Sequence, residues 1–208
     1  MSCAHCGFDC TAKGKDMNIR TFRASVKLAK EITGRICLGG GEPTIHPRFW
    51  DFMSISLATF RKEVTVVTNG SQTETSLALA HMSTHGVIHA CLSLDDYHDP
   101  IEKIVVDTFK LGKASGDDRR GVVGDRGDGL GKPLFIKIGR AAANGIGHNE
   151  YCLCDNLIID PDGKIWRCGC RLEQYGTVFD PKLPKLDRGC YYGCSKQTDS
   201  WVFGKKNK

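Results

Sequence analysis

The stretch Arg35-Ile-Cys-Leu-Gly-Gly-Gly-Glu-Pro43 is the clearest indication of the fold of this chain. Its first four residues are those of a short buried strand, and a run of glycines follows directly. The same order returns at residues 63–70, where a β-branched strand runs into Asn-Gly, and at residues 87–96, where an apolar strand runs into Asp-Asp. Strands that each end in turn-forming or polar residues indicate a repeated structural unit.

The segments between these strands carry the apolar periodicity of amphipathic helices. The predicted helices are residues 18–33, 48–61, 73–83 and 100–111. Alternating strands and helices build a parallel sheet with right-handed crossovers. Ligands of such sheets bind beyond the carboxyl ends of the strands, which is where the glycines and polar residues fall.

The predicted alternation of strands and helices ends after residue 114. Residues 115–132 are rich in glycine and charge, which predicts a mobile loop. Residues 134–138 return to an apolar strand that ends at Gly139-Arg140-Ala141. Arg140 is a pocket candidate because a guanidinium binds carboxylates through two hydrogen bonds, and an ordinary surface ion pair is the alternative.

Bulk properties decide how the cysteines are interpreted. The chain has 208 residues, a formal net charge of +5 and 11 cysteines. It contains no apolar run long enough to cross a membrane, no signal peptide opens it, and its charges are interspersed. We therefore expect a cytoplasmic protein with no membrane partner and no obligatory nucleic-acid partner. Cytosolic thiols stay reduced, so metal binding is the leading explanation for this many cysteines.

The cysteines gather near the two ends of the sequence, which predicts two metal centres. The first group is Cys3, Cys6 and Cys10, and the second is Cys152, Cys154, Cys168, Cys170, Cys190 and Cys194. Cys37 and Cys91 stand alone inside apolar runs, and we expect both to be small buried hydrophobic residues.

The ordered motifs Cys3-Ala-His-Cys6, Gly40-Gly41-Glu42-Pro43, Thr68-Asn69-Gly70 and Ser93-Leu-Asp95 resemble those of the radical S-adenosylmethionine (SAM) superfamily. The resemblance implies a partial (β/α)6-type barrel of parallel strands with crossover helices. It also implies a [4Fe–4S] cluster that reductively cleaves SAM to a 5′-deoxyadenosyl radical, which abstracts hydrogen from a substrate. The electron would come from a donor of the flavodoxin or ferredoxin type.

The cluster motif departs from the family pattern. The family motif is CxxxCxxC, whereas Cys3, Cys6 and Cys10 are spaced CxxCxxxC. In the favoured explanation Cys3 and Cys6 are the last two ligands and the first ligand, with the first strand, lies upstream of Met1. In the alternative, Cys10 is the third ligand of an unorthodox loop. Thiolates are the usual ligands of iron–sulfur clusters in either case.

The resemblance also implies the residues that bind SAM. Gly40, Gly41, Glu42 and Pro43 would lie along its methionine part, and Asn69, Ser93 and Asp95 would line the same pocket. The last three are equally explained as helix caps and turn residues. His46 and His98 lie near these loops, but the sequence supplies neither with a partner, so we expect solvated or capping residues.

The C-terminal quarter predicts a small cysteine-rich extension. Residues 157–166 have two β-rich arms around Pro-Asp-Gly, the pattern of a hairpin. Cys152 and Cys168 flank it in a spacing that resembles the auxiliary-cluster modules called SPASM and twitch domains. With Cys190 and Cys194 they are the four expected ligands of an auxiliary [4Fe–4S] cluster, although Cys154 and Cys170 compete for the same places. A structural zinc site is the alternative.

Two domains are therefore expected: a radical SAM core over residues 1–145 and the auxiliary-cluster region over residues 146–208. Extensions of this kind in the family often accompany peptide or protein modification, so the expected reaction is an oxidative or cross-linking modification. The rivals are a zinc-binding structural or interaction protein and an inactive barrel fragment.

Overall fold

The computed structural model describes residues 3–11, 13–95, 97–114, 120–123, 139–146, 157–167, 169, 171 and 173–183, and no side chains for 112–114 and 120–123. The described chain divides into two compact units. Unit 1 contains Met1–Cys3, Cys10–Gly14 and Val26–Leu134, and unit 2 contains Ala4–Asp9, Lys15–Ser25 and Phe135–Lys208. The predicted domain division at residues 145 and 146 stays a prediction.

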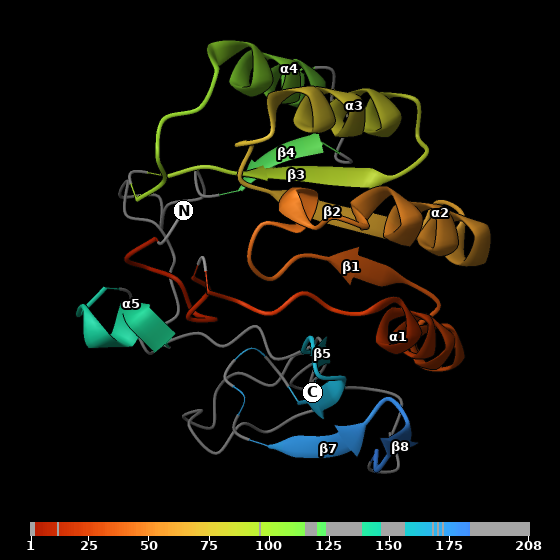
Figure 1. Ribbon diagram of the computed structural model, residues 1–208. Helices are drawn as coiled ribbons and strands as arrows, with labels where there is room; N and C mark the ends of the chain where they lie inside the picture. Colours follow the sequence, from red (N-terminus) through yellow and green to blue (C-terminus); the bar gives the residue numbers. More distant parts are fainter. Residues whose placement is uncertain are drawn as a thin grey trace, which may run out of the picture. The chain divides into compact units, whose positions relative to one another are not determined.

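Unit 1 is built on a four-stranded parallel sheet in the order β1-β2-β3-β4. Its strands are β1 (Ile36–Leu38), β2 (Val64–Thr68), β3 (His89–Ser93) and β4 (Arg120–Val123). The helices that connect them are α2 (Phe49–Phe60), α3 (Thr73–Thr84) and α4 (Lys103–Ala114), drawn beside the sheet in Figure 1. The predicted α/β fold, a partial barrel of parallel strands with crossover helices, is confirmed.

Side chains of the sheet alternate between a buried face and a more open face. Along β2 the residues Val64, Val66 and Thr68 are buried, and Thr65 and Val67 are only partly so. The helices supply the other half of the core, whose members include Met53, Phe60, Leu79, Val105 and Phe109. Burial of each such side chain contributes about 1.5–3 kcal/mol, so this layer holds the strand ends in register.

Helix α1 (Ile19–Ile32) begins and ends where the sequence predicts. The side chain of Asn18 accepts a hydrogen bond of 2.9 Å from the Thr21 N–H, the geometry of an N-cap. Gly34, at φ +69°, closes the other end and donates its N–H to the Ala29 carbonyl. Of the described helices, none is long and apolar enough to span a membrane.

Unit 2 has a second sheet, antiparallel, in the order β5-β6-β7-β8. Its strands are β5 (Ile158–Ile159), β6 (Lys164–Trp166), β7 (Gln174–Thr177) and β8 (Asp180–Pro181). The Asp160 carboxylate organises the first turn, because it accepts hydrogen bonds from the N–H groups of Asp162 and Lys164 and from the Trp166 indole. The predicted hairpin is confirmed, and the pair β7–β8 was not predicted.

One expectation about the secondary structure is wrong. The glycine-rich stretch expected to be a loop contains β4, which pairs in parallel with β3 through Ala90 opposite Arg120. The Val-Val pair at its end has the β-branched character of a strand, and the surrounding glycines obscured it. The predicted strand at residues 134–138 lies outside the described residues.

Candidate functional site

The loop after β1 is a glycine turn beside a cysteine. Gly40 has φ +115°, a conformation that side chains with a Cβ rarely adopt. A Cβ placed on Gly41 would lie 3.6 Å from the Cβ and 3.8 Å from the Sγ of Cys10. The backbone of this loop and one thiol of the N-terminal group are therefore in close contact within unit 1.

Glu42 fastens the β1 loop to the end of β2. Its Oε1 accepts hydrogen bonds from the Thr68 hydroxyl (2.8 Å) and from the Thr44 hydroxyl and N–H, and its Oε2 accepts one from the Asn69 N–H (2.6 Å). It also caps the single 3-10 turn η1 (Pro43–Ile45). Hydrogen bonds to an ionised group are the stronger kind, so one carboxylate fixes both loops.

The loop after β2 is a tight turn. The Asn69 side chain accepts a hydrogen bond of 2.9 Å from the Ser71 N–H, and the Gly70 N–H donates to the Thr68 hydroxyl. Gly70 has φ +78°, and a Cβ there would lie 2.6 Å from Ile101 Cδ1 and 2.9 Å from Leu92 Cδ1. The Asn69 side chain therefore acts as a turn residue, and glycine is required beside it.

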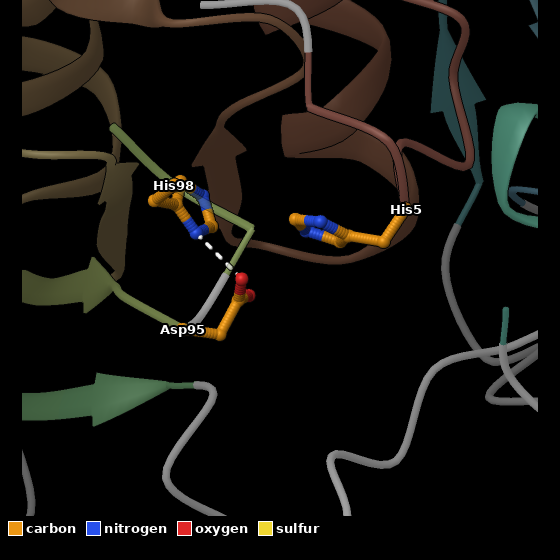
Figure 2. A group of neighbouring side chains, drawn as sticks. All are labelled: His5, Asp95 and His98. Carbon is orange, nitrogen blue, oxygen red and sulfur yellow. Dashed lines mark ion pairs between the residues drawn. The ribbon is translucent and has the colours of Figure 1, made fainter. Parts of the chain in front are cut away.

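The loop after β3 holds a carboxylate–imidazole pair that Figure 2 shows in close view. The Asp95 carboxylate lies 3.0 Å from His98 Nδ1 and accepts a hydrogen bond of 2.8 Å from the Tyr97 N–H. The two side chains are only 4% and 6% exposed. The pair therefore brings a buried carboxylate and a buried imidazole together at this edge of the sheet.

His98 was predicted to be a solvated or capping residue, but it is buried against Asp95. The missed signal was the spacing of three residues within a turn, which brings Asp95 and His98 together. His46 does serve a local role, because its Nδ1 accepts the Arg48 N–H at 3.0 Å, close to the start of α2. Ser93 is the last residue of β3 and is half-buried.

The open face of the sheet carries the two isolated cysteines. Cys37 is exposed, so its predicted burial is wrong, and Cys91 is intermediate. Although Cys37 is exposed, the protein around it still desolvates its thiolate and raises the pKa of the thiol to about 11, with a smaller contribution from Cys91.

The Cys6 segment lies in unit 2, together with Arg140. The short helix α5 (Gly139–Ala143) begins beside this segment, and the Arg140 N–H donates a hydrogen bond of 3.0 Å to the Cys6 carbonyl. The structure therefore places Arg140 next to the predicted ligand loop through its backbone. Its guanidinium role in a pocket stays a prediction.

Comparison with known proteins identifies the family. The model of the radical SAM superfamily matches residues 1–111, more than half of the chain. The chain belongs to the radical SAM superfamily. The crystal structure of BtrN in complex with AdoMet and 2-DOIA resembles this radical SAM protein at a TM-score of 0.57 and 16% identity, over 86% of this chain and 73% of that one. At this identity the likeness supports the fold. No curated protein matches the sequence.

The cysteines of the N-terminal loop suit the cluster that the radical SAM family implies. Cys3, Cys6 and Cys10 are partly exposed thiols within eight residues that form neither helix nor strand. Such a backbone can turn several thiolates toward one metal centre. The donor set is therefore of the right chemistry, and Cys10 lies against the glycine turn of this radical SAM protein.

The C-terminal cysteines cannot be placed in the same way. Cys152, Cys168, Cys190 and Cys194 lie outside the described residues, as do Cys154 and Cys170. The auxiliary centre of this radical SAM protein stays a prediction for that reason.

Proposed function

We propose that this radical SAM protein is an enzyme that binds a [4Fe–4S] cluster through Cys3, Cys6 and a third thiolate, and binds SAM beside it at the carboxyl ends of β1 to β3. The main support for the proposal is the Glu42 carboxylate, whose hydrogen bonds join the loop Gly39–Pro43 to the loop Thr68-Asn69-Gly70. When bound, such a cluster supplies the electron that splits SAM into methionine and the 5′-deoxyadenosyl radical, which takes hydrogen from the substrate.

Different residues of the chain would make different contributions to SAM binding. Glycine backbone at Gly40 and Gly41 allows close approach to the methionine part, because no side chain stands in the way. The Glu42 carboxylate already accepts hydrogen bonds from Thr44, Thr68 and Asn69. It would therefore hold the loop in shape rather than contact SAM. AdoMet in the BtrN complex supports the choice of cofactor.

The third cluster ligand is either Cys10 or a cysteine upstream of Met1. Cys10 is supported by its position beside Gly41. Iron analysis of a Cys10→Ala variant, made in a protein extended upstream of Met1, separates the two: loss of the cluster assigns Cys10, and a full cluster assigns the upstream cysteine.

The substrate class extends the proposal. A peptide or protein that undergoes oxidative modification is supported by the resemblance of the C-terminal cysteines to SPASM and twitch modules, which would hold an auxiliary [4Fe–4S] cluster. A flavodoxin or ferredoxin would donate the electron in the cytoplasm.

Two measurements test the proposal against a zinc-binding structural protein. Anaerobic reconstitution should give the visible absorbance of an iron–sulfur protein, because zinc is colourless. Calorimetry should then show SAM binding that depends on the iron. SAM binding of equal affinity to the iron-free protein, or a colourless protein that retains zinc, would contradict the proposal.

A further inference from the structure

Helix α5, together with the turn of Asn144 and Gly145 that ends it, contacts the predicted ligand loop at two places, although it lies more than 130 residues away in sequence. The Arg140 N–H donates a hydrogen bond of 3.0 Å to the Cys6 carbonyl. The Asn144 side-chain amide donates one of 2.9 Å to the Ala4 carbonyl. Both carbonyls belong to Cys3-Ala-His-Cys6, the segment that carries two of the expected cluster ligands, and Figure 1 shows α5 beside this part of the chain.

Gly139 makes this close approach possible. It has φ +54°, and a Cβ at this position would lie 2.6 Å from the Gly7 carbonyl oxygen and 2.8 Å from the Cys6 carbonyl oxygen. Both obstacles are backbone atoms, which cannot rotate away as a side-chain end can. Any residue larger than glycine would therefore displace either α5 or the peptide after Cys6.

We propose that α5 positions the cluster-binding loop, with Gly139 setting its approach and Asn144 holding the peptide between Cys3 and Cys6. The direction of a ligand side chain follows from the position of its own peptide, so fixing the Cys6 and Ala4 carbonyls fixes where the Cys6 thiolate points. The inference rests on the proposed function, because it assigns a role in cluster binding to a loop whose cluster belongs to that proposal.

The chain offers a matched control for Gly139 at the other end of the same helix. Gly145 has φ +68°, and a Cβ there would meet nothing within 4 Å. Alanine at either position imposes the same unfavourable backbone conformation, but only Gly139→Ala adds a collision with the loop. A difference between the two variants therefore reports the contact and not the strain.

The test uses the full-length protein, reconstituted anaerobically, as wild type, Gly139→Ala and Gly145→Ala. The readout is the electron paramagnetic resonance signal of the cluster reduced with dithionite. A change in this signal when SAM is added marks the cluster with an open iron. Gly139→Ala should carry about tenfold less of this signal per chain, whereas Gly145→Ala should resemble wild type. In the iron-free chain, hydrogen exchange of residues 3–9 should be faster in Gly139→Ala alone.

A second pair of variants separates positioning from a merely structural role. Asn144 is exposed, so neither Asn144→Ala nor Asn144→Asp should lower the thermal midpoint of the iron-free protein. Asn144→Asp adds a negative charge beside the ligand loop, which should make the reduction potential of the SAM-responsive cluster more negative than in Asn144→Ala. Equal potentials in wild type and both variants would overturn the role of Asn144.

The outcomes distinguish a failure of this inference from a failure of the proposed function. A wild-type protein without a SAM-responsive cluster would contradict the proposed function itself. A wild-type protein with that cluster, together with Gly139→Ala that carries as much of it as Gly145→Ala, would overturn only the role of α5.

Discussion

The Glu42 carboxylate accepts a hydrogen bond of 2.6 Å from the Asn69 N–H, which joins two loops 27 residues apart in sequence. The same side chain accepts the Thr68 hydroxyl at 2.8 Å. Because these loops follow neighbouring strands, the hydrogen bond links them at the edge of the sheet where SAM is proposed to bind. Glu42 is therefore the residue on which the shape of this edge most depends.

Replacing Glu42 by glutamine tests this dependence. Glutamine keeps the size of the side chain but loses the charge and one acceptor oxygen, so the variant should unfold at lower urea, with a loss of about 1–3 kcal/mol. SAM affinity of the reconstituted protein should fall about tenfold. The control is Glu63→Gln, at an exposed position just before β2. Equal stability and affinity in the two variants would contradict the role of Glu42.

Gly70→Ala should destabilise the protein through a collision. The new Cβ would lie 2.6 Å from Ile101 and 2.9 Å from Leu92, at φ +78°. Overpacking together with backbone strain should cost about 2–5 kcal/mol in urea unfolding. Gly34→Ala, at φ +69° with nothing within 4 Å, should cost only the strain of about 1–2 kcal/mol. Similar losses in both variants would show that the packing around Gly70 adapts.

The pair of Asp95 and His98 should behave as one energetic unit. A double-mutant cycle with Asp95→Asn and His98→Ala should give a coupling free energy of about 0.5–3 kcal/mol, because the side chains are only 4% and 6% exposed. The exposed pair of Lys103 and Asp107 on α4 serves as the comparison and should give about 0.3–0.5 kcal/mol. Additive effects of the Asp95 and His98 substitutions would show that the contact between them adds nothing to the free energy of unfolding.

The thiol of Cys37 should react slowly at moderately alkaline pH. Its pKa is raised from 9.0 to about 11, chiefly because the surrounding protein desolvates the thiolate, and the thiolate is the reactive form. The rate of alkylation by iodoacetamide, followed by mass spectrometry of the peptide that contains Cys37, should keep rising toward pH 11. A rate that levels off near pH 9, as for an unperturbed thiol, would refute this.

The same shift links Cys37 to stability with a definite sign. The folded chain holds the thiol proton to higher pH than the unfolded chain, so it binds more protons between about pH 9 and 11. The free energy of unfolding should therefore fall as pH rises through that window. Cys37→Ala should show a smaller fall than wild type over the same range.

Much of the fold could be predicted because local pattern and tertiary structure agree. The run from Val64 to Thr68 is β-branched, alternates between buried and open positions, and ends in Asn-Gly, and the structure has β2 there. Strand β4 was missed because glycines on both sides outweighed its two valines. Its pairing with β3 is a tertiary contact that local propensity does not report.

The sequence indicates candidate site residues but not the contacts between them. The order of strands implies that the loops of Glu42 and Asn69 are neighbours, yet the sequence cannot say that the carboxylate bonds the next loop. The Asp95 and His98 pair and the approach of Gly139 to Cys6 depend on turn geometry and on long-range packing. Spacing along the chain carries little information about either.

The proposed reaction requires that the protein form 5′-deoxyadenosine from SAM. Full-length protein, reconstituted anaerobically and supplied with SAM and dithionite, should release 5′-deoxyadenosine and methionine, and Cys6→Ala prepared in the same way should release neither. Iron-loaded wild-type protein that binds SAM but forms no 5′-deoxyadenosine, or Cys6→Ala that forms as much as wild type, would contradict the account.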